Sequence, residues 1–420
     1  MKVGGSLRVP GDKSISHRSL ILGALAEGDS RVTSILESAD VKSTAGVLRA
    51  LGVDVPPIGA DFVVRGTGRR GLRQPLAQLD AGNSGTTTRL MAGVVAALPI
   101  AATFVGDASL SRRPMRRVAR PLEAMGARFD LPAHGGLPMT VHGGSLHDIE
   151  WTSEVASAQV KSAILLAALA SGVRARVIEP ERTRDHTERM LAARGATLSV
   201  DGSTVTLDAN SPLTPLDTRV PGDPSSAAFF AGLAAIARGG ELRLEGVCMN
   251  DTRTGFFRTL RAMGARVDEE NQRVEGGEPV ADVIVAPRAL RAAVVTREDV
   301  PAMVDELPLL ACLATRAEGE TRITGANELR VKESDRITAV VDNLRAIGAD
   351  AEELQDGMVI RGSDRPLRGR ILTHADHRLA MAFGILGAAE GNAIEVDDPS
   401  CVEVSYPGFW SDLERVTAAV

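Results

Sequence analysis

One unit of sequence recurs six times along this chain of 420 residues. Each copy starts with a small polar cluster that runs into an Ala/Leu-rich stretch, then a turn of small residues, then a strand-like run. The clusters start at residues 14, 84, 158, 225, 305 and 376. A repeat of this length is a whole supersecondary unit rather than one turn of a solenoid. If the copies stack alike, six helix N-termini face one way and form a strong site for anions.

A second pattern follows the Ala/Leu-rich stretch in five of the six copies. An amphipathic segment ends in a glycine and leads into a strand, at residues 48–52, 122–126, 191–195, 260–264 and 344–348. These segments predict a second helix in each copy, with glycine at its C-terminal end. The sixth copy ends without this segment. We therefore expect the N-terminal strand, roughly residues 2–9, to join the C-terminal copies.

The repeats predict an α/β protein with two domains of three copies each. Turn signals near residue 11 and at residues 220–223 mark the boundaries. One domain would contain residues 12–222, and the other residues 1–11 together with residues 223–420. The length agrees, because a chain of this size exceeds one small core. The two crossings between the domains would form a hinge beside a cleft.

The composition excludes several classes of protein. The net charge of −6, with 24% charged and 44% hydrophobic residues, is typical of a soluble globular protein and argues against a nucleic-acid-binding surface. The N-terminal residues contain no apolar run of signal-peptide length, and the apolar stretch at residues 92–105 is too short to span a bilayer. Three dispersed cysteines without a CxxC pair argue against structural zinc and disulfides, and fit a reducing cytoplasm.

Cationic and hydroxyl side chains are concentrated at the heads of the copies. The Ala/Leu-rich helices are apolar on nearly all sides, so we expect them to be buried with only these heads facing the cleft. Cations at a helix N-terminus oppose the helix dipole unless an anion binds there. The candidate cations are Lys13, Arg18, Arg89, Arg113, Lys161, Arg184, Lys332, Arg336 and Arg378. They exceed what one small anion needs, which predicts two anionic substrates side by side.

The C-terminal copies carry groups suited to acid/base chemistry. Glu333 lies between Lys332 and Arg336, two cations that would hold its charge state in place. Asp305 heads the fifth copy, where it could also be a plain helix-terminal acid. His377 stands beside Arg378 at the head of the sixth copy, which favours a site residue over a structural histidine.

Six motifs together resemble the 5-enolpyruvylshikimate-3-phosphate synthases, a family of enolpyruvyl transferases. The motifs are DKSISHRS at 12–19, GNSGTTTRL at 82–90, RRPM at 112–115, SAQVKSA at 157–163, RVKESDR at 330–336 and DHRLAM at 376–381. The resemblance covers essentially the whole chain. It implies the two-domain enolpyruvyl transferase fold, in which each domain holds three βαβαββ repeats in an arrangement like an inverse α/β barrel, with a cleft between the domains.

The resemblance also implies the reaction and its partners. The enolpyruvyl group of phosphoenolpyruvate would be transferred to the 5-hydroxyl of shikimate 3-phosphate by addition and elimination, with release of phosphate. No metal and no organic cofactor would take part. The reaction belongs to aromatic amino acid biosynthesis and is the target of glyphosate, and Gly85 favours sensitivity to it. The partners would be these two small molecules, with no nucleic acid and no membrane, and the protein would be a cytoplasmic monomer.

The resemblance assigns roles residue by residue. The groups implied in catalysis are Lys13, Asp305, Lys332, Glu333 and His377. Those implied in binding shikimate 3-phosphate are Lys13, Ser14, Arg18, Ser157, Ala158, Gln159, Arg184, Asp305 and Lys332. Those implied in binding phosphoenolpyruvate are Lys13, Gly85, Arg113, Gln159, Arg336 and Arg378. Asp305 would take the hydroxyl proton, and Glu333 would exchange the proton at the methylene carbon.

The sequence departs from one branch of this family at four positions. Where that branch has a serine, a proline, a tyrosine and a lysine, this chain has Ala158, Leu90, His186 and Val404. Two other functions are weighed against the leading one. A UDP-N-acetylglucosamine enolpyruvyl transferase usually has a cysteine in the loop at residues 112–117, and this loop has none. A non-catalytic binder of phosphorylated acids would not need Asp305, Glu333 and Lys332 together.

Overall fold

Each of the six polar clusters lies at the start of a helix in the computed structural model, which describes residues 1–418. Asp12, Ser84, Asp223 and Asp376 cap four of these helices by accepting a hydrogen bond from a backbone N–H in the first turn. The six helices are buried along most of their length, as their apolar composition predicts. They are α1 (Lys13–Leu25), α3 (Gly85–Ala96), α6 (Ala158–Ser171), α8 (Pro224–Ala235), α10 (Leu307–Ala314) and α12 (His377–Ala388).

The second helix predicted in five copies is also present. These helices are α2 (Ala39–Ala50), α5 (Arg116–Ala124), α7 (His186–Ala193), α9 (Gly255–Ala262) and α11 (Arg336–Ala346). The glycine that follows each of them has a φ between 85° and 115°. This left-handed conformation ends a helix at little cost only when the residue has no side chain. The remaining helices are α4 (Ala108–Ser111), α13 (Phe409–Ala418) and the short 3₁₀ segments η1 (Val300–Ala302), η2 (Val304–Glu306), η3 (Asn327–Val331) and η4 (Pro399–Val404).

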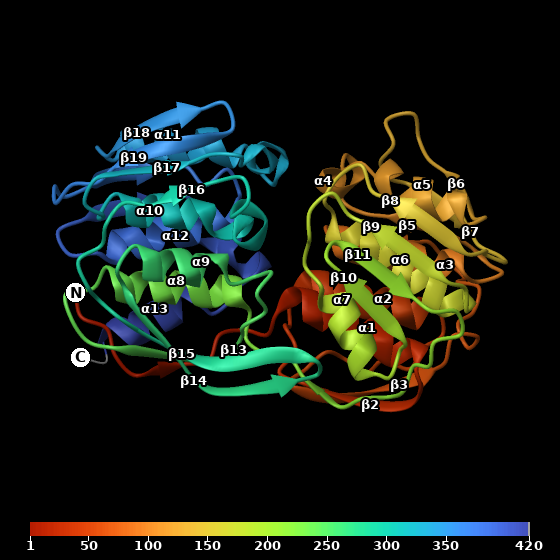
Figure 1. Ribbon diagram of the computed structural model, residues 1–420. Helices are drawn as coiled ribbons and strands as arrows, with labels where there is room; N and C mark the ends of the chain where they lie inside the picture. The colour runs from red at the N-terminus through yellow and green to blue at the C-terminus, as the bar shows by residue number, and fades with distance from the viewer. Residues whose placement is uncertain (419–420) are drawn as a thin grey trace. The chain divides into compact units, whose positions relative to one another are not determined.

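The described chain forms two compact units. Unit 2 contains Gly11–Val220 together with the short segment Val274–Glu278, and unit 1 contains Met1–Pro10, Pro221–Arg273 and the described chain from Pro279 onward. The strands of unit 2 are β2 (Glu27–Thr33), β3 (Asp61–Thr67), β4 (Leu79–Asp80), β5 (Ala101–Val105), β6 (Arg128–Asp130), β7 (Met139–His142), β8 (Ile149–Thr152), β9 (Ala175–Ile178), β10 (Leu198–Asp201), β11 (Thr204–Leu207) and β12 (Thr218–Arg219). Figure 1 labels most of these strands along the chain.

The remaining strands are distributed over three sheets. They are β1 (Ser6–Leu7), β13 (Leu242–Cys248), β14 (Arg266–Glu275), β15 (Glu278–Ala286), β16 (Val294–Val295), β17 (Glu320–Ile323), β18 (Asp350–Leu354), β19 (Gly357–Arg361), β20 (Arg368–Ile371) and β21 (Ala393–Val396). The turn between β14 and β15 falls in the segment that belongs to unit 2.

The sheets repeat one topology. In β4-β5-β7-β6, β8-β9-β11-β10 and β16-β17-β19-β18, a parallel pair is followed by two antiparallel strands. The order β1-β13-β15-β14 follows the same plan, β12-β2-β3 has the parallel pair and one antiparallel strand, and the sixth copy has only the parallel pair β20-β21. The first helix of each copy packs on a strand of its own sheet. The sheets therefore leave the helix N-termini, with their polar residues, as the distinctive part of each copy.

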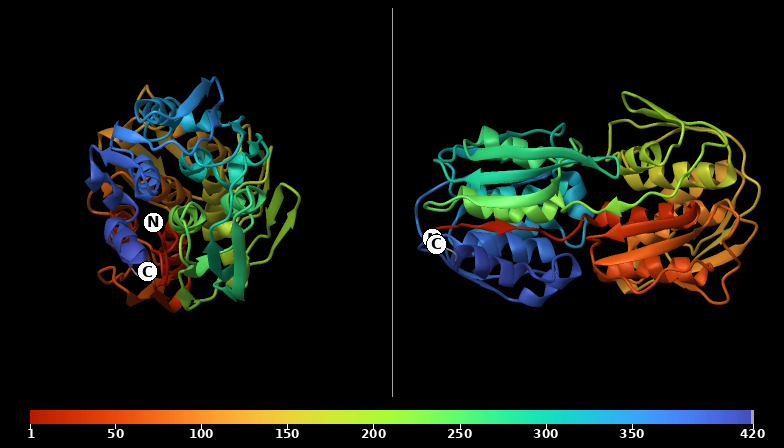
Figure 2. Two further views of the ribbon diagram at one scale, coloured as in Figure 1. Left: turned by 90° about the vertical axis from the view of Figure 1, so that its left-hand side faces the viewer. Right: turned by 90° about the horizontal axis from the view of Figure 1, so that it is seen from below.

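In each unit, one sheet is completed by a strand that lies outside the copy in the sequence. β12 pairs in parallel with β2, and β1 pairs in parallel with β13. The N-terminal strand is shorter than residues 2–9, because Gly5 has a left-handed φ of 86° and Pro10 lacks an N–H for a sheet ladder. The N–H of Gly4 donates to the carbonyl of Val416 at 3.1 Å, so β1 lies beside α13 (Figure 2).

The buried helices pack against each other within each unit. In unit 2, α3 contacts both α1 and α6, and in unit 1 the helices α8, α10 and α12 contact one another. A glycine allows the close approach of α3 to α6. A Cβ on Gly93 of α3 would lie 2.2 Å from the carbonyl oxygen of Ala163 in α6, so no other residue fits there. The close packing fixes the relative positions of the polar residues at the helix N-termini.

Candidate functional site

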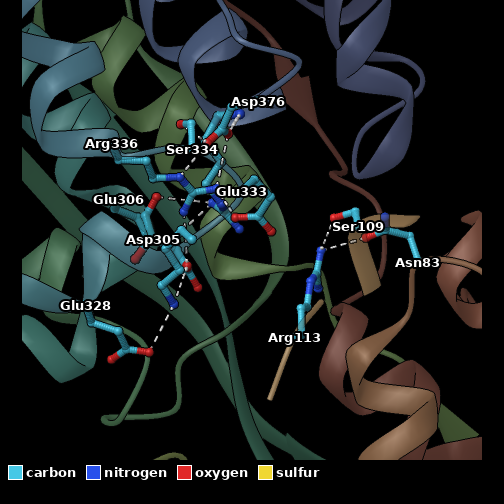
Figure 3. Close-up of polar contacts among 12 residues, drawn as sticks. Asn83, Ser109, Arg113, Asp305, Glu306, Glu328, Glu333, Ser334, Arg336 and Asp376 are labelled. Atoms are coloured by element: carbon cyan, nitrogen blue, oxygen red, sulfur yellow. Dashed lines mark hydrogen bonds and ion pairs between the residues drawn. The ribbon is translucent and has the colours of Figure 1, made fainter. Parts of the chain in front are cut away.

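Unit 1 brings charged residues from its fifth and sixth copies together around one guanidinium. Arg336, the first residue of α11, is buried, and its Nε lies 2.7 Å from Asp376 Oδ2. Its Nη2 lies 2.8 Å from Glu333 Oε2, and its Nη1 lies 3.6 Å from Asp305 Oδ1. Figure 3 shows these carboxylates converging on Arg336. One arginine thus orients three carboxylates that come from three separate segments of the chain.

The charges in this cluster shift one another's pKa. Burial disfavours the ionised form of Glu333, but Arg336 and His377 outweigh it and hold the Glu333 pKa below its ordinary value. Asp376 behaves likewise, since the attraction of Arg336 exceeds the cost of burial and lowers its pKa. Burial acts against the charged form of Arg336, yet Asp376 and Glu333 raise its pKa. Both carboxylates are therefore ionised at neutral pH, and Glu333 is available to accept a proton.

Two further cations border the same cluster. Lys332 Nζ lies 3.8 Å from Asp305 Oδ1 and 3.3 Å from the exposed Glu328. Arg378 donates from Nη1 to the backbone carbonyl of Asp305 at 3.4 Å. Within residues 1–418, Arg336 Nη1 has no hydrogen-bond partner although it is buried. A buried guanidinium N–H without an acceptor is a group that a ligand oxygen would satisfy.

Unit 2 gathers a second set of cations at the N-termini of α1 and α3. Arg18 is buried, and it donates to Thr187 Oγ1 at 2.7 Å and to Ser162 Oγ at 2.8 Å. A third hydrogen bond of 2.9 Å reaches the carbonyl of Ser14. Burial lowers the Arg18 pKa to about 10, and the nearby Arg184 also lowers it. Lys13 Nζ lies 3.4 Å from Asp40 Oδ2 on α2.

The heads of α3 and α6 are joined through Arg89. Its Nη1 donates to Gln159 Oε1 at 2.6 Å, and Gln159 Nε2 donates to Thr86 Oγ1 at 3.1 Å. Burial lowers the Arg89 pKa to about 10, and the charges of Arg117 and Arg113 add to this effect. Like charges held this close favour a bound anion, which would relieve their repulsion. Arg113 donates to Asn83 Oδ1 at 2.7 Å, as Figure 3 shows.

The structure distributes the expected site residues over both units. Unit 2 holds Lys13, Ser14, Arg18, Gly85, Arg113, Ser157, Ala158, Gln159 and Arg184. Unit 1 holds Asp305, Lys332, Glu333, Arg336, His377 and Arg378. Ser157 precedes α6 and its side chain does not cap that helix, so its hydroxyl is not used there. His377 begins α12 and is buried.

One candidate cation is not available to a substrate. Lys161 is 1% exposed, and its ammonium lies 2.6 Å from Glu179 and 2.7 Å from Glu188. The prediction that Lys161 adds to the anion site is wrong, because two buried carboxylates already neutralise it. His186 is also buried, with its Nδ1 2.7 Å from Glu278 Oε1. Val404, which replaces a lysine of one branch, lies in η4 and is half-exposed.

Several residues in these clusters carried no clear sequence signal. Thr187 and Ser162 hold Arg18, but a hydroxyl in a helix gives no hint of such a contact. Asp376 could have been found, because it opens the DHR motif directly before His377. In the described chain, no group of three His, Cys, Asp or Glu side chains could hold a metal ion. Helices long and apolar enough to cross a membrane are likewise absent from residues 1–418.

Comparison with known proteins gives one consistent result. The EPSP synthase (3-phosphoshikimate 1-carboxyvinyltransferase) family matches residues 1–413. The 3-phosphoshikimate 1-carboxyvinyltransferase of Sulfurihydrogenibium sp. (strain YO3AOP1) is 49% identical over 421 residues, covering 99% of this chain and 98% of the relative. That of Novosphingobium aromaticivorans is 50% identical, with 98% and 97% covered. These similarities favour this family over the UDP-N-acetylglucosamine enolpyruvyl transferases.

Solved structures agree on the fold. An EPSP synthase from Acinetobacter baumannii has a TM-score of 0.91 at 42% identity, covering 99% of this chain and 96% of that one. The enolpyruvyl transferase NikO from Streptomyces tendae has a TM-score of 0.78 at 18% identity, and its likeness concerns the fold alone. The predicted enolpyruvyl transferase fold is therefore confirmed.

Proposed function

Because this chain belongs to the EPSP synthase (3-phosphoshikimate 1-carboxyvinyltransferase) family, we propose that it transfers the enolpyruvyl group of phosphoenolpyruvate to the 5-hydroxyl of shikimate 3-phosphate. The observation that carries this proposal is the Arg336 cluster. Its guanidinium lies within 3.6 Å of Asp305 and 2.8 Å of Glu333, so two carboxylates and a cation are held at one place. Acid/base exchange beside a charged leaving group needs this combination.

The proposed reaction balances as an addition followed by an elimination. Asp305 takes the proton of the 5-hydroxyl while the hydroxyl oxygen bonds to C2 of phosphoenolpyruvate, and C3 accepts a proton from the protonated form of Glu333. C3 then loses a proton to Glu333, the C2–O bond to the phosphoryl group breaks, and phosphate leaves with the proton that the hydroxyl gave up. Lys13 contacts both substrates and assists proton transfer, and His377 acts as an accessory group beside Glu333. The charges of Glu333 and its neighbours are consistent with these steps.

The ionisation of Glu333 fits both halves of this cycle. In the structure Arg336 holds the carboxylate ionised, which suits proton removal from C3. A phosphoenolpyruvate anion bound to Arg336 would offset part of that positive charge and so raise the Glu333 pKa. Binding of the substrate would thereby favour the protonated form that the addition step needs. No metal or organic cofactor is required for either step.

Substrate contacts are proposed from the charge and position of each group. Ser14, Arg18, Ser157, Ala158, Gln159 and Arg184 would bind shikimate 3-phosphate, with Asp305 and Lys332 holding the reacting hydroxyl. Gly85, Arg113, Gln159, Arg336 and Arg378 would bind phosphoenolpyruvate. The arginine cluster at Arg89, Arg113 and Arg117 supports an anion near the head of α3. We also propose a monomer in a reducing cytoplasm, where buried thiols such as Cys312 stay reduced.

Phosphate release from phosphoenolpyruvate tests the function. We expect release that depends on shikimate 3-phosphate as acceptor. The control replaces the acceptor with UDP-N-acetylglucosamine, for which we expect none. Release with that nucleotide sugar alone would favour the rival transferase. Binding of both acids without any phosphate release would leave a non-catalytic binder.

Replacing Gly85 with alanine should selectively weaken the binding of phosphoenolpyruvate. A Cβ at this position would lie 2.9 Å from Arg89 Nη1, the atom that donates to Gln159, and 3.6 Å from Nη1 of Arg113, which is proposed to bind phosphoenolpyruvate alone. Moving Arg89 disturbs one charged hydrogen bond, worth roughly 1.5–3 kcal/mol, so we expect KM for phosphoenolpyruvate to rise at least about tenfold. Steady-state kinetics with each substrate varied in turn measure this. Gly46→Ala is the control, since nothing lies within 4 Å of its Cβ, and equal changes in both variants would contradict the prediction.

A further inference from the structure

A buried carboxylate that the proposed reaction does not use lies at the start of α10. Glu306 is the last residue of η2, and its side chain is 2% exposed. The residue stands at the N-cap position of α10, but its side chain makes no capping hydrogen bond. Of the hydrogen-bond donors within residues 1–418, only the Ser225 hydroxyl is near enough to interact with its carboxylate. Burying a carboxylate is costly unless nearby cations compensate, so its surroundings have to explain its presence.

Two arginines on different elements provide that compensation. Arg378 of α12 lies with Nη1 3.7 Å from Glu306 Oε1. Arg253, which is buried in the loop between β13 and α9, also attracts the Glu306 carboxylate. Arg253 is itself held by Asp223 Oδ1 at 3.2 Å and by Ser225 Oγ at 2.9 Å. The charges alternate in sign through Asp223, Arg253, Glu306 and Arg378, a row that we call the Glu306 row.

The contacts of Arg378 indicate what the Glu306 row does. Both contacts that hold its guanidinium, to Glu306 and to the carbonyl of Asp305, use Nη1. In the described chain the Nε and Nη2 edge is engaged by neither contact, and the side chain is 13% exposed. An arginine held by one nitrogen can present its other two N–H groups to a carboxylate or phosphate as a fork. Glu306 therefore fixes the direction in which the fork points.

Stability alone does not account for the Glu306 row. A buried ion pair is weak evidence for a stabilising role, because well-packed apolar residues often do as well or better. An apolar residue at position 306 would fill the space next to α12 without holding Arg378 by Nη1. The contact is therefore useful chiefly for what it does to Arg378.

We propose that Glu306 is a positioning residue, which holds Arg378 by Nη1 so that its Nε and Nη2 edge receives an anionic group of phosphoenolpyruvate. This inference rests on the proposed function. It also gives the head of the fourth copy a part in the site, because Asp223 and Ser225 keep Arg253 in place behind Glu306. Glu306 does not touch the reacting atoms and takes no part in proton transfer.

The test uses Glu306→Gln in the full-length protein. Glutamine keeps the shape and removes the charge, so Arg378 loses its anchor. We expect KM for phosphoenolpyruvate to rise about tenfold or more, with kcat within threefold and KM for shikimate 3-phosphate within twofold of wild type. Glu306→Asp, which keeps the charge on a shorter side chain, should recover part of the loss. Glu188→Gln, a matched loss of a buried carboxylate in unit 2, should not raise KM for phosphoenolpyruvate selectively.

A double-mutant cycle shows whether Glu306 acts through Arg378. Arg378→Ala alone should weaken the binding of phosphoenolpyruvate more than the binding of shikimate 3-phosphate. Adding Glu306→Gln to it should then change KM for phosphoenolpyruvate less than twofold, because the residue it positions is gone. Full additivity in this cycle overturns the proposal. An unchanged KM in Glu306→Gln, or an equal rise for both substrates, overturns it as well.

A failure of the proposed function can be distinguished from a failure of the Glu306 proposal. In that case the wild-type protein would release no phosphate in the presence of shikimate 3-phosphate. Phosphoenolpyruvate binding is then measured without turnover, as the rise in unfolding temperature that the ligand causes. Glu306→Gln should show a smaller rise than wild type at each phosphoenolpyruvate concentration. If phosphoenolpyruvate raised the unfolding temperature of both proteins equally, the proposed role of Glu306 would be refuted, whatever the outcome for the proposed function.

Discussion

Replacing Glu333 with glutamine should lower kcat by about 10²- to 10⁴-fold while both KM values stay within about threefold, the usual effect of removing a general acid/base group. The carboxylate lies 2.8 Å from Arg336, and glutamine can keep one contact to that guanidinium without exchanging a proton. Substrate anions should therefore still bind. What the variant loses is the group that accepts a proton from C3.

The measurement combines steady-state kinetics with proton exchange. In D₂O the wild-type enzyme should introduce deuterium at the methylene carbon of phosphoenolpyruvate or product, and Glu333→Gln should lose this exchange in proportion to kcat. Glu352→Gln is the control, since its exposed ion pair with Arg361 lies outside the cluster. A variant with normal kcat but much higher KM for phosphoenolpyruvate would show that Glu333 serves binding rather than proton transfer.

The repeat and its helix ends are the part of this fold that the sequence reveals best. The apolar helices, the polar residues before them and the glycines after the second helices are local features, and each is decided by a few neighbouring residues. Gly52 and Gly348 stand where the chain must turn with positive φ, so their positions could be read directly. The motif resemblance then named the reaction, because the residues at the helix heads differ from copy to copy.

Contacts between distant segments were beyond the sequence. Arg336 and Asp376 are 40 residues apart, and only the packing of α11 and α12 against α10 brings them to 2.7 Å. Glu306 and Arg253 belong to different copies, so the residues around one give no indication of a contact with the other. Lys161 shows the opposite error. A lysine at a helix head suggests an anion site, yet the fold places Glu179 and Glu188 against it. Which charges are neutralised inside the protein depends on tertiary structure alone.

The buried position of Lys161 leads to the largest expected effect on stability. Replacing it with methionine keeps most of its volume but removes the cation between Glu179 and Glu188. Breaking a buried pair by removing one partner costs roughly 3–5 kcal/mol, because the remaining charge is left without compensation. We expect the free energy of unfolding at pH 8 to fall by about that amount, as measured by urea titration. Arg361→Met should lower the free energy of unfolding far less, since its three carboxylate partners are exposed.

The loss in Lys161→Met should also depend on pH. Burial already raises the Glu188 pKa above its ordinary value of 4.5, and Lys161 is the main group that opposes this rise. Without Lys161 the folded protein should bind a proton that the unfolded chain releases. Stability then falls as the pH rises from the unfolded pKa toward the raised folded pKa. The variant should therefore be closer to wild type at pH 5 than at pH 8, and a loss independent of pH would contradict the uncompensated-charge explanation.

A combined variant separates charge from packing. Lys161→Met together with Glu179→Gln and Glu188→Gln removes all three charges while nearly preserving the side-chain volumes. If the single variant suffers from uncompensated carboxylates, the triple variant should regain most of the lost stability at pH 8, because replacing a whole buried ion cluster by uncharged residues is often close to neutral. Thr183, which donates to Glu179 Oε1 at 2.5 Å, can still donate to the amide oxygen of the glutamine. A triple variant less stable than Lys161→Met alone would instead show that the ion cluster as a whole stabilises unit 2.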